Sequence, residues 1–373
     1  NSLYPSMMHS ESGNGYPVGH PTFFVGPEIP KEALAPDAYY FVRISTRFYI
    51  KPGRLPFVQN KSSFMYSATE SLETSDIYDE GKYYKYYIDF DGSRQPATMT
   101  MTLTETDWEL IREQYDLKDL IIMDGCYFKK KYGLFDSYID KYRRMKMTSK
   151  GARRVLAKLF LNNLCGKMAA STDSTYKVAY VKEDHTIGFY SVVASGKKPG
   201  YIPIGAAITS YARNFTIRAA QANYYGPDQP GFIYADTDSI HCDLQADQLR
   251  GIRVDPAEFC CWKLESSWDK GWFVRQKTYM EHVTAEDQEP VDDPYWSIKC
   301  AGMPDACKDL FLRSMRGEAA RPEEREAIRR FLQTRRNVED FAPGLTVPGK
   351  LTPRRIPGGV VLQDSYFQMR DFY

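Results

Sequence analysis

Short runs of alternating apolar and polar residues fill much of the first third of the chain. Between residues 39 and 104 they are separated by turn sequences such as Lys51-Pro52-Gly53. Alternation with a period of two is typical of strands that bury one face, so a β-rich segment is predicted here. The DFDG sequence at residues 89–92 resembles a metal loop, but a hairpin turn explains it more simply. Residues 10–30, rich in glycine and proline, are predicted to be an exposed connection after a strand end that Pro5 stops.

Other stretches repeat their apolar residues about every 3.6 positions, as amphipathic helices do. Helices are predicted over residues 104–115, 134–145, 149–164 and 203–223. The first is expected to have Thr104 or Thr106 as its N-cap, because acidic residues follow in its first turn. Two shorter helices are predicted over residues 244–251 and 256–263.

The helix predicted over residues 149–164, with Thr148 or Ser149 as its expected cap, separates into two faces. One face is expected to pack, and the other is expected to bind. The packing face comprises Ala152, Val155, Leu156, Leu159, Phe160 and Asn163, and the binding face comprises Arg154, Lys158, Asn162 and Cys165. A basic helix face is usually only solvated, but residues 141–168 contain nine basic residues and no acidic one. A bound polyanion is therefore expected there.

The second half of the chain contains further strand patterns. A hairpin is predicted within residues 172–200, and strands are predicted over residues 232–241, 272–282 and 296–301. Residues 284–294 are expected to form an acidic loop, and the charged run 316–336 a solvated helix pair.

Two aspartates interrupt the apolar strand predicted at residues 232–241. Asp236 and Asp238 are separated only by Thr237. Alternate residues of a strand face the same way, so the two carboxylates could share one Mg²⁺ or bridge a pair of ions, as in two-metal phosphoryl transfer. A polar hairpin turn is an equally good explanation of these residues alone, because Asp is common in turns.

Composition limits the class of protein. The chain has 373 residues, of which 43% are hydrophobic, and a net charge of +1, so it can form a large core and is not a polycation. Its seven cysteines include no CxxC pair, which favours reduced thiols in the cytoplasm of a cell over a disulfide framework or a zinc site. No apolar run is long enough to cross a membrane and no signal-peptide pattern is present, so no membrane partner and no secretion are expected.

Six sequence blocks, taken in order, resemble family B DNA polymerases, specifically the protein-primed replicative polymerases of small tailed bacteriophages. They are SLYP at residues 2–5, KLFLNNLCG at 158–166, YADTDS at 234–239, KTY at 277–279, KCAGM at 299–303 and PGGVV at 357–361. Each block is weak by itself, but their order and spacing along the whole chain make the resemblance specific.

The resemblance implies an α+β right-hand polymerase with palm, fingers and thumb and two insertions of the protein-primed type. The implied divisions are a palm start (1–25), a first insertion near the terminal protein (26–135), fingers (136–171), a second, processivity insertion (172–200), palm (201–305) and thumb (306–373). It also implies primer-template DNA, dNTPs and a terminal, priming protein as partners, strand displacement, and the cytoplasm of the phage's host cell as the location.

The resemblance assigns roles to individual residues. Asp236 and Asp238 are the implied catalytic carboxylates and ligands of two Mg²⁺ ions, with Mn²⁺ as an alternative. Nucleotide binding is implied for Tyr4, which would exclude a ribose 2′-hydroxyl, and for Lys146, Lys158 and Asn162. Contacts to the primer strand are implied for Thr237, Lys277, Tyr279 and Lys299.

Two departures from the family pattern matter. The first motif normally begins with a metal-binding Asp two positions before the residue that matches Asn1, and Cys165 stands where a Tyr is usual. The leading expectation is a template-directed DNA polymerase core, impaired without that Asp. The alternative is a noncatalytic fragment that binds DNA or the terminal protein. A nuclease would not need Lys146 and Lys158, and reverse transcriptases have adjacent aspartates.

Overall fold

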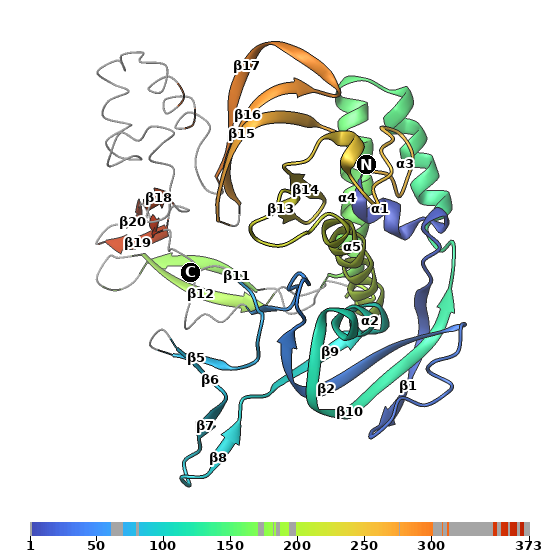
Figure 1. The fold of residues 1–373 in the computed structure, drawn as a ribbon, viewed down its shortest axis with the longest axis vertical. Helices are drawn as coiled ribbons and strands as arrows, with labels where there is room; N and C mark the ends of the chain where they lie inside the picture. The colour runs from blue at the N-terminus through green and yellow to red at the C-terminus, as the bar shows by residue number, and fades with distance from the viewer. Residues whose placement is uncertain are drawn as a thin grey trace. The chain divides into compact units, whose positions relative to one another are not determined.

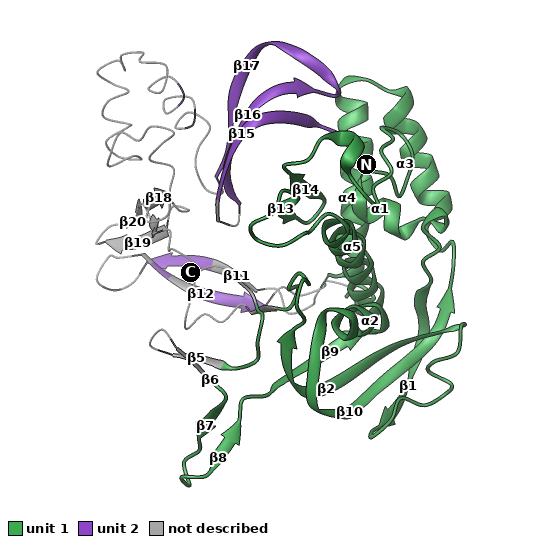
Figure 2. Cartoon of the chain, in the orientation of Figure 1, with its two compact units in different colours: residues 1–172, 197–262 green, residues 173–196, 263–373 purple. Residues whose placement is uncertain are grey.

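The computed structural model divides into two compact units, residues 1–172 with 197–262 and residues 173–196 with 263–373 (Figures 1 and 2). It describes residues 2–60, 70–79, 82–170, 175–181, 183, 187–193, 199–275 and 277–300, residues 308 and 312, and the backbone of four short strands between 346 and 368. Within the described residues, no helix is long and apolar enough to cross a membrane.

An antiparallel four-stranded sheet, ordered β1-β10-β2-β9, is the largest element of the first unit (Figure 1). Its strands are β1 (Tyr16–Val25), β2 (Ala38–Ile50), β9 (Met99–Thr104) and β10 (Tyr115–Lys131). Alternate residues of β2, including Val42, Ile44 and Phe48, are fully buried against helix α2 (Glu105–Gln114). The Thr104 hydroxyl caps α2 by accepting a hydrogen bond from the Asp107 amide at 3.1 Å, which confirms the predicted cap.

Two predictions for this sheet need correction. Residues 10–30 are not only an exposed connection, because β1 pairs with β10 along most of its length after a short 3₁₀ helix, η1 (Ser10–Ser12). Strand β10 itself was not predicted. Its charged and apolar residues do not alternate strictly, and most of them are only partly buried. Its place in the sheet is set by pairing with β1 on one side and β2 on the other.

Three small hairpins extend from the sheet between β2 and β9. They pair β3 (Gln59–Asn60) with β4 (Glu70–Ser71), β5 (Ile77–Asp79) with β6 (Lys82–Tyr84), and β7 (Tyr86–Ile88) with β8 (Arg94–Pro96). Residues 89–92 form the turn between β7 and β8, closed by a hydrogen bond from the Asp89 amide to the Ser93 carbonyl. The predictions of a β-rich segment and of a hairpin turn at this sequence are confirmed.

Among the described residues, four further helices belong to the first unit. They are α1 (Leu3–Met8), α3 (Asp136–Thr148), α4 (Gly151–Met168) and α5 (Ile202–Ala222). The strand end predicted before residue 8 is wrong, because Pro5 lies in the first turn of α1, where its missing amide costs nothing. Helix α5 confirms its prediction, with Pro203 at its start.

The predicted faces of α4 are also wrong. Ala157, Leu161 and Cys165 are the buried residues, whereas Val155, Leu156, Leu159 and Phe160 remain 44–58% exposed. Helix α4 contacts α1, α3 and α5, and small side chains allow this close approach. Its N-cap is Lys150, which makes no capping hydrogen bond with its side chain, and not Thr148 or Ser149.

A short hairpin follows α5. Strand β13 (Phe232–Asp236) pairs antiparallel with β14 (Ser239–Cys242). Only one turn of 3₁₀ helix, η2 (Ala246–Gln248), occurs where two short helices were predicted, and residues 256–263 are not helical.

The strands that the structure describes in the second unit are antiparallel. Its described strands are β11 (Thr175–Val181), β12 (Ile187–Val193), β15 (Ser266–Arg275), β16 (Thr278–Glu286), β17 (Glu289–Cys300), β18 (Thr346–Pro348), β19 (Thr352–Ile356), β20 (Gly359–Gln363) and β21 (Tyr366–Gln368). The β11–β12 pair confirms the predicted hairpin. The single strand predicted over residues 272–282 is instead the end of β15 and the start of β16, and the predicted acidic loop shrinks to the turn before Glu289. Most of residues 301–345, which include the predicted charged helices, lie outside the described residues.

Candidate active site

The two aspartates of the YADTDS sequence lie at the tip of the β13–β14 hairpin. Asp236 is paired with Ser239, and Thr237 and Asp238 form the connection between them. The metal-site and turn interpretations therefore do not exclude each other, because the turn carries the carboxylates. The expectation that both aspartates lie on one face of an extended strand is wrong, since Asp238 already belongs to the turn.

Backbone hydrogen bonds fix this tip. Thr237 adopts a left-handed conformation with φ of 52°, which is uncommon for a β-branched residue. Its carbonyl accepts a hydrogen bond from the Thr216 hydroxyl of α5 at 2.8 Å, and its own hydroxyl donates to Asp236 Oδ1 at 3.1 Å. The Asp238 amide donates to the Asp236 carbonyl at 2.6 Å. A strained conformation held by such contacts is a feature of functional sites.

Tyr4 of α1 brings the N-terminal motif to the same place. Burial is the main cause that raises the pKa of its phenol. Cys165 of α4 and the carboxylates of Asp238 and Asp236 raise it further, and the Arg213 guanidinium of α5 opposes them. These influences require the phenol to lie near all four groups, so α1, α4, α5 and the hairpin converge here.

Cations gather at the other end of the same short motif. Lys146 of α3 donates a hydrogen bond from Nζ to the Ser2 hydroxyl at 3.2 Å. The pKa of Lys146 is lowered, first by burial and then by the positive charges of Lys158, Arg154 and Arg143. Neighbouring cations repel one another and destabilise the folded chain unless an anion binds between them. This is the electrostatic character of a phosphate site.

The predicted binding face of α4 is in part available. Lys158 and Asn162 are exposed, and a Cβ added at Gly166 would meet no atom within 4 Å, so this side of the helix is open. Cys165, which was expected on the same face, is buried, and burial raises the pKa of its thiol. It therefore belongs to the buried cluster against which Tyr4 packs and does not line the open surface.

The remaining candidates lie in the second unit. Tyr279 of β16 is directly opposite Lys299 of β17 and Phe273 of β15, and its ring stacks on Phe273 at 5.2 Å. Lys277 lies in the turn before β16, with φ of 57°. Tyr279 and Lys299 are thus neighbours in the sheet, whereas Lys277 and Tyr279 do not share one continuous strand.

The oxygen donors of the hairpin suit a hard cation. Magnesium is often bound through one or two carboxylates together with substrate phosphates, and Asp236 and Asp238 supply that number at a half-buried and an exposed position. The described part of the chain contains no cluster of three or more His, Cys, Asp or Glu side chains arranged to hold a metal. The donor set thus fits ions that the substrate helps to bind.

Sequence reasoning missed two residues of α5. Arg213 Nη1 lies 2.6 and 2.7 Å from the two carboxylate oxygens of Asp107 in α2, and its charge reaches Tyr4. Thr216 supports the turn at Thr237. Arg213 is the first charged residue of an apolar helix, which could have marked it. Nothing in the sequence around Thr216 distinguishes it from a packing residue.

Comparison with known proteins identifies the class. Residues 1–253 match the family described as DNA polymerase type B, organellar and viral. This match covers more than half of the chain, and the similar proteins below extend it, so the chain belongs to the organellar and viral type B DNA polymerases.

Several of the similar proteins are phage DNA polymerases. The chain is 33% identical over 380 residues to the DNA polymerase of Bacillus phage Nf, with 99% of this chain and 57% of the relative covered. It is 34% identical over 383 residues to that of Bacillus phage phi29, with 99% and 56% covered. The chain therefore spans little more than half the length of these relatives.

A solved structure agrees with the sequence matches. The chain is similar to phi29 DNA polymerase complexed with primer-template DNA and incoming nucleotide substrates, with a TM-score of 0.72 and 33% identity, covering 99% of this chain and 57% of that one. This likeness, with the mixture of helices and sheets seen here, confirms the expected α+β polymerase fold.

Proposed function

We propose that this chain is the polymerase part of a DNA-directed DNA polymerase. It would transfer deoxynucleotides from dNTPs to a primer 3′-hydroxyl, or to a hydroxyl of a terminal protein, and displace a DNA strand ahead of it. One observation supports this most directly. The short segment from Ser2 to Tyr4 lies between a cationic cluster at Lys146 and the carboxylates of Asp236 and Asp238. A nucleoside triphosphate with divalent ions needs both kinds of charge side by side.

The carboxylates would hold the metal. Asp236 and Asp238 would bind two Mg²⁺ ions, with Mn²⁺ as an alternative, and Asp238 is the more exposed of the two. When bound, such ions stabilise the attacking and leaving oxygens of an in-line phosphoryl transfer. The chain's own part is to keep the two carboxylates at fixed positions, which the hydrogen bonds around Thr237 provide.

The nucleotide would be bound by residues from three helices. Lys146 and Lys158 would neutralise the triphosphate, which also relieves the repulsion between them. Tyr4 would exclude a ribose 2′-hydroxyl, because its ring is half-buried beside the aspartates. The exposed amide of Asn162, one helical turn from Lys158, would contact the nascent base pair.

Contacts to DNA would come from both units. Thr237 would lie near the primer terminus, and Lys277, Tyr279 and Lys299 would hold the primer strand. The similarity to phi29 DNA polymerase complexed with primer-template DNA and nucleotides supports these partners. We retain the proposed terminal-protein partner, a site of action in the host cytoplasm, and the division into palm (1–25 and 201–305), fingers (136–171), thumb (306–373) and two insertions (26–135 and 172–200).

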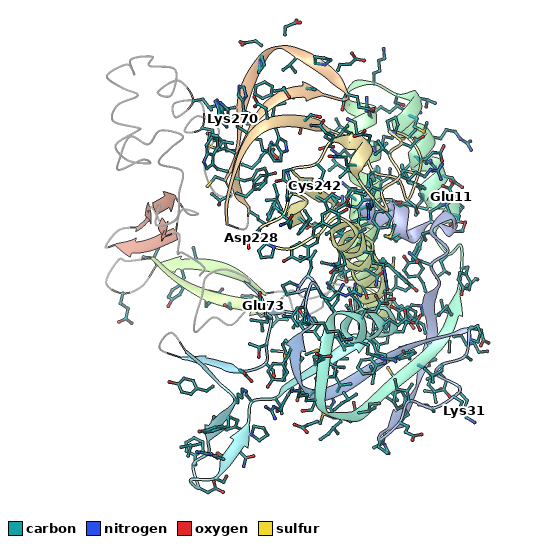
Figure 3. All side chains as sticks on the ribbon, in the orientation of Figure 1. Glu11, Lys31, Glu73, Asp228, Cys242 and Lys270 are labelled. Atoms are coloured by element: carbon teal, nitrogen blue, oxygen red, sulfur yellow. The ribbon has the colours of Figure 1, made fainter. Side chains whose placement is uncertain are left out.

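The decisive test replaces one carboxylate of the protein. Asp238→Ala should abolish incorporation of dNTPs into a primed template while binding of primer-template DNA changes less than about twofold. Incorporation is followed by primer extension, and binding by fluorescence anisotropy. The matched control is Asp228→Ala, which removes an exposed carboxylate from the loop before β13 (Figure 3). Asp228→Ala should extend primers at the parent rate.

The alternative of a noncatalytic fragment predicts other results. A binding module would bind DNA or a terminal protein equally well with and without the Asp238→Ala substitution, and the parent chain would extend no primer. Membership of the polymerase family favours the catalytic function. Retained synthesis by Asp238→Ala would refute the assigned role of the hairpin.

A further inference from the structure

A polar network fastens helix α3 to the residues that follow α1. His9, the C-cap of α1, is only 6% exposed, and its ring lies 5.3 Å from the ring of Phe259. Its Nδ1 accepts a hydrogen bond from the Glu11 amide at 3.2 Å. Its Nε2 lies 3.2 Å from Asp140 Oδ1 of α3, without a hydrogen bond between them. The Ser10 amide donates to the α3 carboxylate of Asp136 at 3.0 Å.

Arg143 makes the widest set of contacts in this network. Its guanidinium donates to Glu11 Oε1 at 3.2 Å and to the Ala257 carbonyl at 3.0 Å, and lies 3.7 Å from Glu258 Oε2. The same group lies 3.9 Å from the centre of the Phe259 ring. Its side chain is 19% exposed. One arginine therefore joins α3 to two segments that are far apart in the sequence.

The nucleotide-binding candidate Lys146 is one helical turn beyond Arg143. Lys146 contacts Ser2, before α1, while Arg143 contacts Glu11, after it. Helix α3 therefore contacts the chain on both sides of α1. Figure 3 shows Glu11 beside the end of α1. Because Lys146 is itself half-buried among cations, its interaction with Ser2 alone is a weak restraint.

We infer that His9, Glu11, Asp140 and Arg143 form a clasp that positions Lys146 for the incoming triphosphate, so that Arg143 is a positioning residue for nucleotide binding. The inference rests on the proposed function, in which Lys146 binds the dNTP. The clasp acts through the placement of α3, since its members contact one another and Phe259, whereas Ser2 is the hydrogen-bond partner of Lys146. Loss of the clasp weakens dNTP binding and leaves the carboxylate hairpin in place.

The test uses two substitutions that each remove one charge from the ion pair between Arg143 and Glu11. Arg143→Gln and Glu11→Gln should each raise the KM for dNTP about tenfold, within the range of coupling between contacting residues, while kcat falls less than about threefold. Glu11→Gln retains the Arg143 charge, so it separates placement from the electrostatic field. A charge effect alone would raise KM only in Arg143→Gln.

A second readout does not depend on catalysis. Lys146 should be acetylated severalfold faster in both variants than in the parent, measured by mass spectrometry of the peptide, because release of α3 exposes its amine. The acetylation rate of Lys146 in Arg143→Lys should lie between those of the parent and Arg143→Gln. An ammonium reaches Glu11 but does not also span Ala257 and Glu258.

Arg218→Gln is the matched control. Arg218 of α5 makes a paired contact with Glu113 of α2, at 2.8 and 2.9 Å, and lies outside the clasp. Arg218→Gln should lose about as much thermal stability as Arg143→Gln. Its KM for dNTP and its rate of Lys146 acetylation should be those of the parent. If KM and acetylation of Lys146 are the same in Arg143→Gln, Glu11→Gln and the parent, the clasp does not position Lys146. Failure of the proposed function is distinct, because the parent itself would then incorporate no dNTP.

Discussion

The β13–β14 hairpin and the α3–α4 helix pair present opposite charges by different means. At the hairpin, two carboxylates are placed by the backbone of a turn, and Thr216 and Thr237 supply the supporting hydrogen bonds. At the helix pair, Lys146 is placed by contacts between side chains of separate elements. The carboxylates of the hairpin are therefore placed mainly by residues that are close in sequence. The cations of the helix pair come together only when separate helices pack.

The largest effect is expected when a charge is removed from the β13–β14 hairpin. Asp236→Asn retains the hydrogen bond from Thr237, because the amide oxygen also accepts, but removes the negative charge. We expect kcat for dNTP incorporation to fall on the order of a thousandfold, about 4 kcal/mol of barrier. Single-turnover primer extension checks this. Asp228→Asn serves as the control, and an active Asp236→Asn would show that this position needs only a neutral acceptor.

A change in the α3–α4 helix pair should affect the KM for dNTP more than kcat. Lys158→Gln should raise the KM for dNTP about tenfold, because one charge-assisted contact to the triphosphate is lost. It should also raise the pKa of Lys146, since Lys158 is the first of the cations that lower it. Lys167→Gln, about 14 Å further along α4 at 1.5 Å per residue, is the comparison and should have a smaller effect. Equal effects would indicate a diffuse field and not a defined site.

Thr216→Val tests whether the hairpin is as local as its sequence suggests. The substitution retains the shape of the side chain and removes the hydroxyl that donates to the Thr237 carbonyl. We expect a loss of about 1 kcal/mol of stability, and a severalfold fall in kcat with KM for dNTP unchanged. Thermal unfolding and steady-state kinetics measure the two. Thr209→Val, one α5 residue whose hydroxyl only bonds back to its own helix, is the control.

These two regions also explain what the sequence can predict. The YADTDS block identifies the carboxylates because Thr237, Asp238 and Ser239, its own neighbouring residues, make hydrogen bonds to Asp236. The faces of α4 are mispredicted because Ala157 and Cys165 give little hydrophobic signal, although they allow α4 to approach α1 and α5. Strand β10 escapes prediction for a related reason, since its partners and not its own pattern define it. The Arg143 contacts join positions more than 100 residues apart, which no local pattern encodes.

The smallest expected effect is on the pH dependence of stability. Burial and neighbouring cations lower the pKa of Lys146 in the folded chain below its ordinary value of 10.5. Between the folded and the ordinary pKa the unfolded chain binds more protons, so stability rises with pH in that window. Below it, the charged form is penalised in the folded state. Lys146→Met should therefore be more stable than the parent near neutral pH, with a difference that shrinks as pH approaches 10.5.

Urea unfolding at a series of pH values measures this difference, and Lys167→Met is the control because Lys167 is exposed at the end of α4. The result sharpens the contrast between the two regions. If the gain in stability of Lys146→Met is independent of pH, the charge of Lys146 is not unfavourable in the folded chain. The contrast between the helix pair and the hairpin would then not hold. A gain that disappears toward high pH, together with weaker dNTP binding, would show that the fold maintains an unfavourable charge that the triphosphate relieves.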